Sequence, residues 1–373
     1  AKLATAETKA QAARRALRTA QRDVDSATRA AKPTADRRQA VVALISRMAG
    51  KRIDPETPVA DIEKALWTRF NERLRQIVEG TTIATHGPLV TVQVGDRTMV
   101  VSSRRRLNWE GGTPSAARLV VGDRVSVEMK GDEGVIVAVH ARTSYLLRRA
   151  PGGAKAQVLA ANVDQALLVF SAGKPEPRRG LLDRFLVACE LAAITPVIAM
   201  NKVDQGTDAV EEWLSVYEDI GYEVLRVSAR TGWGLGRVRR RLADRTTLFC
   251  GPSGAGKSSL LNAVYPGFRL KVGSISESTG KGRHTTSRAE LMPLPYGGFV
   301  VDTPGLKEFG LWRATREELQ SAFLEFAAVD GRCRFPDCCH LNEPECAVLE
   351  AVERGDIDAG RHASYATSLA EVE

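Results

Sequence analysis

Apolar and polar residues alternate with a period of two between residues 81 and 143, which is the pattern of half-buried β-strands. Glycine and aspartate interrupt the alternation and mark turns. The strands are expected in the segments TTIATHG, LVTVQVG, TMVVSS, RVSVEM and GVIVAVH. Five short strands in so short a stretch predict a small barrel of the OB type, which we assign to residues 81–150. Such barrels often bind nucleic acid, although the fold alone does not establish that use.

From about Ala160 to Leu311, longer apolar runs alternate with helical stretches. The runs are NVDQALLVFSA, TPVIAMN, YEVLRVSA, TTLFCG and GGFVVDTPG. They predict an α/β domain with a largely parallel sheet, which we assign to residues 151–312. A helical segment near residues 315–328, a cysteine cluster and two short helices follow, in a C-terminal domain of residues 313–373.

The pattern before the barrel is helical. Apolar residues recur there at helical spacing: Ile62, Leu66, Phe70, Leu74 and Ile77. The spacing predicts an amphipathic helix over residues 56–80 that ends at Gly80. Residues 1–50 have few large apolar side chains to bury, so an extended or partly disordered arm is expected. We therefore treat residues 1–80 as a basic, helical or partly disordered N-terminal extension.

The composition and net charge of the chain indicate what kind of partner it binds. The chain is 43% hydrophobic and 26% charged, which is typical of a globular protein of about two or three domains. It has no apolar run long enough for a membrane span, and neither a membrane span nor a secretory signal is expected. The formal net charge of +8 suggests a polyanionic partner. Most of that charge lies in residues 1–50, where eleven lysines and arginines stand against four acidic residues.

Residues 251–258 read Gly-Pro-Ser-Gly-Ala-Gly-Lys-Ser, directly after the apolar run TTLFC and before the helical stretch SSLLNAV. This is the phosphate-binding loop pattern in its required context, where backbone N–H groups converge on a phosphate at a helix N-terminus. Lys257 would reach the β- and γ-phosphates, and the Ser258 hydroxyl would bind Mg²⁺. The residues expected to hold the nucleotide here are Gly251, Ser253, Gly254, Gly256, Lys257, Ser258 and Ser259.

The identity of the nucleotide base is indicated by the sequence Asn201-Lys202-Val203-Asp204, at the end of the apolar run TPVIAM. A carboxylate such as that of Asp204 can accept hydrogen bonds from both guanine N1–H and N2–H₂, and adenine offers no such pair of donors. The sequence Ser228-Ala229-Arg230 matches the GTPase element that contacts guanine O6.

A fourth element is Asp302-Thr-Pro-Gly305. In GTPases, an aspartate at the position of Asp302 holds Mg²⁺ through water, and the Gly305 N–H would face the γ-phosphate. The four elements together predict a GTP site.

The order of these elements is unusual, because NKVD and SAR precede the phosphate-binding loop, whereas Ras-like proteins carry the loop first. The same sheet can form if the old termini are joined and the chain is opened elsewhere. A circularly permuted P-loop GTPase domain is therefore expected. In this order, the γ-phosphate-sensing residues 270–305 lead directly into the C-terminal domain.

Four of the six cysteines lie between residues 333 and 346, in the pattern Cys333-x4-Cys338-x-His340-x5-Cys346. Three thiolates and one imidazole make a closed tetrahedral Zn²⁺ site, which indicates one structural zinc and a reducing compartment. Cys339 is expected outside the site, since adjacent residues rarely both bind one ion in so tight a loop. Basic residues around this knuckle could also make it an RNA contact.

A barrel of the OB type, a permuted GTPase domain and a Cys-x4-Cys-x-His-x5-Cys knuckle, in this order, resemble the RsgA (YjeQ) family of GTPases. The resemblance covers about residues 80–365 and includes the phrases AANVDQALLV, GKSSLLNA, GRHTTS, DTPGLKEFGLW and PECAVLEAVERG. It implies a GTP hydrolase that is stimulated by the small ribosomal subunit, binds rRNA and acts late in the assembly of that subunit. The implied partners are the small subunit with its rRNA, GTP and GDP, without a membrane. A cytoplasmic monomer is expected, with an organellar matrix or stroma as the alternative location.

The resemblance also assigns the segment Gly282-Arg-His284-Thr285-Thr286 to the switch element, in which a threonine contacts Mg²⁺ and the γ-phosphate. Thr285 and Thr286 are therefore expected in the GTP site. The expected Mg²⁺ ligands are Ser258, Thr286 and Asp302.

Leu306 stands where Ras-like GTPases carry the glutamine that orients the attacking water, so another group must do so. We expect that group to be His284, with Lys257, Thr286 and Gly305 as the other catalytic residues. His284 could instead pack or bind rRNA.

Two other functions stay open at this point. The chain could be a GTP-dependent RNA-binding module with incidental hydrolysis, or a permuted GTPase of another ribosome-assembly family. The knuckle after DTPG and the barrel before NKVD argue against the second. Residues 1–80 are longer and more helical than the basic tail usual in the RsgA family, and the resemblance assigns them no role.

Overall fold

The computed structural model describes residues 76–372 with gaps at 87–88, 111–117, 131–132, 150–155, 269–288, 303–313 and 330. The chain divides into two compact units, residues 1–75 and 76–373, and everything described below belongs to the second. The basic arm, and the expected helix as far as residue 75, lie outside the described residues. Within the described ranges, no helix is both long enough and apolar enough to cross a membrane.

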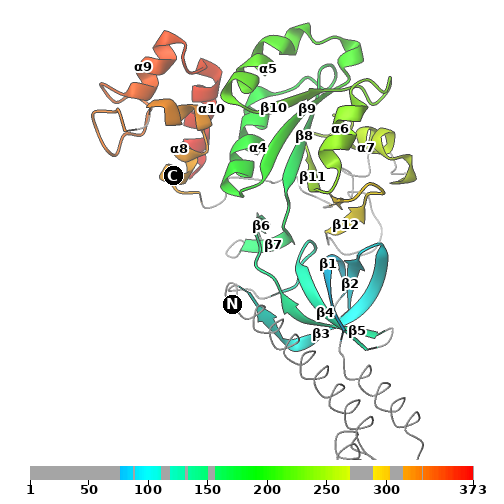
Figure 1. Ribbon diagram of the computed structural model, residues 1–373. Helices are drawn as coiled ribbons and strands as arrows, with labels where there is room; N and C mark the ends of the chain where they lie inside the picture. Colours follow the sequence, from blue (N-terminus) through cyan, green and yellow to red (C-terminus); the bar gives the residue numbers. More distant parts are fainter. Residues whose placement is uncertain are drawn as a thin grey trace, which may run out of the picture. The chain divides into compact units, whose positions relative to one another are not determined.

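Five strands close into the expected barrel, in the order β1-β2-β3-β5-β4 (Figure 1). They are β1 (Gln76–His86), β2 (Leu89–Val94), β3 (Arg97–Trp109), β4 (Arg124–Lys130) and β5 (Glu133–Val139). All neighbouring pairs are antiparallel except β3 with β5. The interior is filled by β-branched side chains, which pack well on pleated strands. They are Val90, Val92, Val101, Val125, Val127, Ile136 and Val139.

The prediction of a helix that ends at Gly80 is wrong for residues 76–80, because these residues begin β1. Their backbone groups pair with β4, starting with Gln76 opposite Met129. A Cβ atom at Gly80 would lie 2.5 Å from Val92 Cγ1, so this glycine allows β2 to pass closely and does not end a helix. Ile77, which the helical spacing placed on an apolar face, is 58% exposed. Pairing with β4 therefore outweighs the local helical pattern.

The α/β domain contains a six-stranded sheet in the order β10-β9-β8-β11-β13-β12. Its strands are β8 (Gln165–Ser171), β9 (Thr195–Asn201), β10 (Glu223–Arg226), β11 (Thr246–Cys250), β12 (Glu290–Pro293) and β13 (Phe299–Asp302). All pairs are parallel except β12 with β13, which confirms the expected, largely parallel sheet. The four residues of β12 are too few to form a recognisable pattern, so the sequence did not predict this strand.

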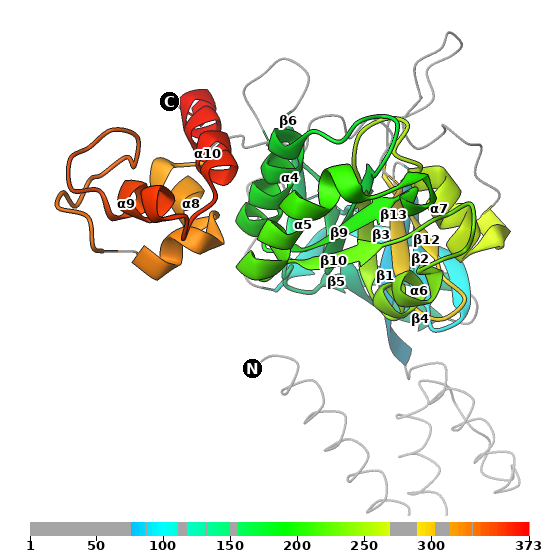
Figure 2. The same ribbon diagram turned by 90° about the horizontal axis from the view of Figure 1, so that it is seen from above.

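Helices cover both faces of this sheet (Figure 2). On one face, α4 (Arg179–Leu191) and α5 (Asp208–Ile220) contribute Leu186 and Leu214 to the core. On the other, α6 (Leu235–Leu242) and α7 (Lys257–Val264) contribute Val238 and Leu261 to a second core. Because the parallel strands all run the same way, the loops after β8, β9, β10, β11 and β13 gather at one edge. Ligands of open α/β sheets bind at that edge.

The barrel is joined to this domain through a hairpin that the sequence pattern did not indicate, β6 (Tyr145–Arg149) with β7 (Ala156–Ala161). A Cβ atom at Gly122 would lie 1.9 Å from the Ala161 carbonyl oxygen, so only glycine permits this close approach. The Asn162 side chain donates to Gly122 O at 2.8 Å and accepts from Thr143 N at 3.0 Å. These contacts fix the path of the chain from the barrel into β8.

The C-terminal domain is built from α8 (Arg316–Ser321), the 3-10 helix η3 (Leu324–Val329), α9 (Ala347–Arg354) and α10 (Ala359–Val372). The rings of Phe323, Phe326 and Tyr365 pack together in its core. Buried Arg361 of α10 forms an ion pair with Asp183 of α4 at 2.8 Å, which attaches this domain to the α/β domain. The barrel, the α/β domain and the helical C-terminal domain confirm the expected fold class.

Candidate nucleotide site and metal centre

The phosphate-binding loop lies between β11 and α7. Two of its glycines have positive φ and no room for a side chain. A Cβ atom at Gly251 would lie 2.0 Å from the Val169 carbonyl oxygen, and one at Gly256 would lie 2.5 Å from Asn201 Nδ2. Close packing against β8 and β9 therefore requires glycine at both positions.

Lys257 is folded into the loop itself. Its Nζ donates to two loop carbonyl oxygens, one of them that of Gly251, at 2.9 Å each. The side chain is buried, and burial lowers the pKa of its ammonium group. In the first turn of α7, Ser258 is buried and Ser259 half-buried, whereas Ser253 in the loop is exposed. These residues surround a helix N-terminus, where the helix dipole favours an anion.

Asn201 joins three loops of the site. Its Nδ2 donates to Ala255 O of the phosphate-binding loop at 3.0 Å, and its Oδ1 accepts from Ala229 N at 3.1 Å. The side chain is 1% exposed, and the bond to Ala255 O is buried. The end of β9, the phosphate-binding loop and residues 228–230 therefore meet at one edge of the sheet.

Lys202 has a left-handed backbone, with φ of 63°, and its side chain reaches the phosphate-binding loop. Its Nζ donates to Gly254 O at 2.8 Å and to Lys174 O at 2.5 Å. Pro175 also packs on this loop, because its Cδ is 3.3 Å from the ideal Cβ position at Gly254. Sequence reasoning missed the contacts of residues 174 and 175, because a backbone carbonyl and a proline ring form no motif.

Asp204 lies in a 3-10 turn after β9, η1 (Val203–Gln205), and its side chain is 10% exposed. Ser228 Oγ donates to Asp204 Oδ1 at 2.5 Å, and Arg230 Nη2 lies 2.7 Å from Oδ2. The Ser228 hydrogen bond lowers the pKa of Asp204 against the opposing effect of burial, and the charge of Arg230 lowers it further. Asp204 is therefore an ionised hydrogen-bond acceptor beside residues 228–230.

Of the remaining residues expected to contact the nucleotide, only Asp302 lies within the described residues. Asp302 ends β13, which is the neighbour of β11 in the sheet. His284, Thr285 and Thr286 fall within residues 269–288, and Gly305 falls within residues 303–313, both outside the described residues. Their positions around the nucleotide stay predictions.

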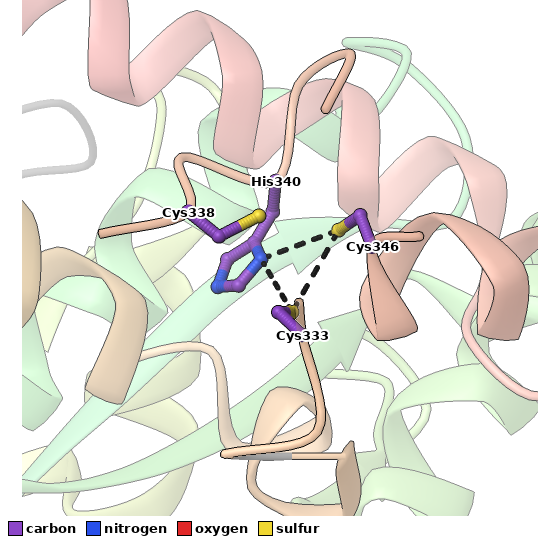
Figure 3. A group of neighbouring side chains, drawn as sticks. All are labelled: Cys333, Cys338, His340 and Cys346. Atoms are coloured by element: carbon purple, nitrogen blue, oxygen red, sulfur yellow. Dashed lines mark hydrogen bonds between the residues drawn. The ribbon is translucent and has the colours of Figure 1, made fainter. Parts of the chain in front are cut away.

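The predicted metal ligands Cys333, Cys338, His340 and Cys346 come together in the C-terminal domain (Figure 3). Their ligand atoms all lie within 4.8 Å of one another. His340 Nδ1 is 3.6 Å from Cys333 Sγ and 3.4 Å from Cys346 Sγ, and these two sulfurs are 3.9 Å apart. Tetrahedral zinc, with Zn–S of ~2.3 Å and Zn–N of ~2.0 Å, requires ligand separations of ~3.5–3.8 Å. The cluster could therefore hold such an ion.

Glu343 orders the loop that carries this cluster, a role that no sequence motif indicates. Its carboxylate accepts from the backbone N–H groups of Cys339 at 2.6 Å, Leu341 at 2.9 Å and Asn342 at 3.1 Å. Burial opposes ionisation of Glu343, but these bonds outweigh it and hold its pKa at about 2. Cys339 stays outside the cluster, and its Sγ accepts from Arg316 Nη1 at 2.8 Å.

Comparison with known proteins identifies relatives of the whole arrangement. A family model described as RsgA GTPase matches residues 139–312. A protein of Gemmatimonas aurantiaca named small ribosomal subunit biogenesis GTPase RsgA is 43% identical over 281 residues, which are 74% of this chain and 91% of that protein. A protein of the same name from Ectopseudomonas mendocina is 46% identical over 260 residues, which are 68% of this chain and 75% of that protein.

Two solved structures resemble the described fold. YjeQ from Thermotoga maritima has a TM-score of 0.64 and 32% identity, covering 80% of this chain and 99% of its own. YloQ, described as a circularly permuted GTPase, has a TM-score of 0.64 and 32% identity, covering 80% of this chain and 96% of its own. At this identity and coverage, the likeness includes the permuted order of the elements.

Proposed function

This chain belongs to the RsgA GTPase family, and we propose that it hydrolyses GTP while bound to the small ribosomal subunit, late in the assembly of that subunit. Its relatives are named for GTP hydrolysis and for small-subunit biogenesis, and it covers 91% of the length of one of them. The chain is thus a GTPase of small-subunit biogenesis. Stimulation by the subunit, rRNA binding, a cytoplasmic location and a monomeric state are the finer parts of the proposal.

The observation that carries the proposal is the bridge made by Asn201. One buried side chain bonds the backbone of the phosphate-binding loop and the backbone of Ala229. The loop that would hold the phosphates and the residues that would read the base are therefore held in one site, although they are far apart in the sequence. Such a site suits a guanine nucleotide, since the ionised Asp204 lies beside it.

We assign the nucleotide contacts as follows. Asp204 would accept from guanine N1–H and N2–H₂, and the backbone of the phosphate-binding loop would surround the β-phosphate. Lys257 would exchange its loop carbonyls for the β- and γ-phosphates. Ser258, Thr286 and Asp302 would supply oxygen ligands to Mg²⁺, which neutralises phosphate charge during phosphoryl transfer.

We further propose that the knuckle holds one structural Zn²⁺ through Cys333, Cys338, His340 and Cys346. Three sulfurs and one nitrogen are a donor set of closed zinc sites, and these four atoms lie within 4.8 Å of one another. All four positions are filled by the protein, so the ion would stabilise the loop and leave hydrolysis to the nucleotide site.

The attacking water needs a group to orient it. Leucine at position 306 can neither donate nor accept a hydrogen bond, so hydrolysis by the free protein should be slow. His284 lies immediately before Thr285 in the segment assigned to the switch, and an imidazole nitrogen can hold a water. We assign the positioning of this water to His284.

The test of the function is steady-state GTP hydrolysis with purified small subunits, with large subunits and without either. We expect an increase of about a hundredfold or more with small subunits alone. Lys257→Ala is the control for contaminating activity and should show no increase. Equal rates in the three conditions would favour the alternative, a GTP-dependent binding module with incidental hydrolysis.

His284→Ala separates the chemical step from binding. It should bind GTP and small subunits as the wild type does, but lose about a hundredfold or more of the stimulated rate. His86→Ala removes an exposed histidine of the barrel and should leave that rate unchanged. If His284→Ala keeps the wild-type stimulated rate, then an rRNA group or the backbone around Gly305 positions the attacking water instead.

A further inference from the structure

A short arginine-rich helix lies on the surface of the α/β domain and has no part in the site described above. It is α6, with the sequence LGRVRRRL, and it contains no acidic residue. Leu235, Val238 and Leu242 are its buried positions, so Arg237 and Arg240 project from the opposite side and are exposed. Figures 1 and 2 show α6 on the outside of the sheet, next to α7.

These two arginines differ from the others in the helix. Arg239 donates to a carbonyl oxygen at the end of α7 at 3.1 Å, and Arg241 lies 3.2 Å from Glu223. The side chains of Arg237 and Arg240 have no ion pair or hydrogen bond within the part of the chain that the structure describes. Two neighbouring positive charges are therefore left without a counter-charge there.

Helix electrostatics do not account for both charges. Cations in the last turn are favourable, because the C-terminal end of a helix carries partial negative charge, and this suits Arg240. Arg237 lies in the first turn, where the same dipole opposes a cation. It also stands three residues from Arg240, and like charges at that spacing destabilise a helix. An external anion would remove this cost.

An exposed aromatic ring lies directly before these arginines. Trp233 precedes α6 by two residues and is 57% exposed. Its carbonyl oxygen accepts from Ser228 N at 3.0 Å. Gly234 has φ of 76°, and a Cβ atom there would lie 2.4 Å from Arg226 O, so the turn that carries the tryptophan is closely packed. The turn therefore holds a large aromatic side chain at the surface.

We propose that Trp233, Arg237 and Arg240, here called the α6 basic surface, bind RNA. The arginines would contact backbone phosphates, for which the guanidinium geometry is suited, and the indole would stack on an unpaired base. This inference rests on the proposed function, because it adds an rRNA contact to it. RNA is favoured over an acidic protein surface because it offers phosphates and ring faces together.

The α6 basic surface borders the loop assigned to base reading. Ser228 bonds Trp233 through its backbone N–H and bonds Asp204 through its hydroxyl. RNA bound at α6 would therefore contact the same turn that supports the guanine-reading carboxylate.

The test is binding of Arg237→Ala/Arg240→Ala to purified small subunits at several salt concentrations. We expect about tenfold weaker binding at moderate salt and a salt slope shallower by roughly two, because each lost phosphate contact removes about one unit. Trp233→Ala should weaken binding several-fold without changing the slope, and Trp233→Phe should bind nearly as the wild type does.

Arg184→Ala/Arg354→Ala is the matched control. It removes the same formal charge from exposed arginines that already form ion pairs with Glu371 and Glu350. All variants should keep the wild-type affinity for GDP and the wild-type unfolding midpoint. If the α6 double variant loses no more affinity than this control, the inference fails.

A cross-linking experiment identifies which molecule contacts the α6 basic surface in the complex with the small subunit. A photo-crosslinking amino acid in place of Arg240 should mark RNA in complexes with small subunits. Marks confined to ribosomal proteins would overturn the inference. A wild-type protein that neither binds small subunits nor is stimulated by them would instead refute the proposed function.

Discussion

The proposed recognition of guanine depends on one carboxylate, that of Asp204, whose pKa is lowered by its neighbours. Asp204 is 10% exposed and is held by the Ser228 hydroxyl and the Arg230 guanidinium, which lower its pKa. Because the folded pKa is depressed, the carboxylate stays ionised throughout the neutral range. It is therefore available to accept two hydrogen bonds from guanine.

Asp204→Asn should lower the affinity for GTP by about tenfold or more and raise that for xanthosine triphosphate. The amide can donate to the xanthine oxygen that replaces the guanine amino group. Competition against a fluorescent nucleotide measures both affinities. Asp208→Asn alters an exposed residue in the first turn of α5 and should change neither. Unchanged GTP affinity in Asp204→Asn would contradict the assignment.

A second single carboxylate, that of Glu343, orders the loop of the candidate metal centre. Glu343→Gln should lower zinc affinity about 10–100-fold, because an amide oxygen accepts the three backbone N–H groups more weakly. The folded pKa of about 2 lies below the ordinary value of 4.5, so this stabilisation is complete above pH 4.5 and is lost as the pH falls towards 2. The difference between wild type and variant should therefore stay constant between about pH 6 and pH 8.

Competition with a chromophoric chelator measures this difference. Glu345→Gln is the control, because its carboxylate pairs with the exposed side chain of Arg334 and should leave zinc affinity within about twofold. Equal affinities of Glu343→Gln and wild type would show that the backbone contacts of Glu343 do not order the site.

At the scale of elements, the knuckle is a loop without regular structure. Residues 331–346 contain no helix or strand. Cys338 and Cys346 are buried in the core beside Phe326, so two of the four candidate metal ligands are also core residues. His340 has a left-handed backbone, with φ of 58°, and its carbonyl oxygen contacts His362 Nε2 at 2.7 Å. We therefore expect this loop, which has no regular structure, to depend on a bound ion to fix its four candidate ligands.

Removal of zinc should therefore unfold the C-terminal domain and leave GDP binding largely intact. Structural zinc sites contribute apparent binding energies on the order of 10 kcal/mol. Limited proteolysis in the presence of a strong chelator should cut within residues 331–372, while a fluorescent GDP analogue stays bound. Added Zn²⁺ should restore resistance to the protease, and added Mg²⁺ should not. Freshly purified protein without zinc by elemental analysis would refute the metal assignment.

At the scale of the molecule, buried charges join the C-terminal domain to the α/β domain. Arg361 donates to Asp183 at 2.8 Å and to both carboxylate oxygens of Glu325 at 2.7 and 3.0 Å. Asp183 also accepts from Tyr217 OH at 2.6 Å and from Ser364 Oγ at 2.5 Å. Since every charge in this group has a partner, helices α4 and α10 are joined by directional contacts as well as by apolar packing.

Arg361→Met should destabilise the protein by about 3–5 kcal/mol, because it leaves two buried carboxylates without a counter-charge. Arg184→Met is the matched control. It breaks an exposed pair with Glu371, also between α4 and α10, and should cost no more than about 1 kcal/mol. Unfolding in urea, followed by tryptophan fluorescence and circular dichroism, measures both. Equal losses of unfolding free energy in the two variants would show that the buried Arg361–Asp183 pair stabilises the contact between α4 and α10 no more than the exposed pair does.

The sequence by itself determined the parts that depend on residues close together in the chain. Gly251, Gly256 and Lys257 identified the phosphate-binding loop, because backbone freedom, a helix N-terminus and an amine are all supplied within eight residues. The spacing of Cys333 to Cys346 predicted, for the same reason, the cluster that could hold a metal ion. Alternation with a period of two located the barrel strands, and the order of motifs along the chain indicated the permutation.

Only the tertiary structure decided the contacts between distant segments. Arg361 and Asp183 are 178 positions apart, and no local pattern marks either as a partner of the other. Asn201 belonged to a recognised motif, but its bridge to Ala255 and Ala229 depends on where β9 and β11 end. The first residues of β1 follow a helical pattern and become a strand because β4 pairs with them. In each case the energy comes from groups that the fold brings together, and the sequence near one group does not specify the other.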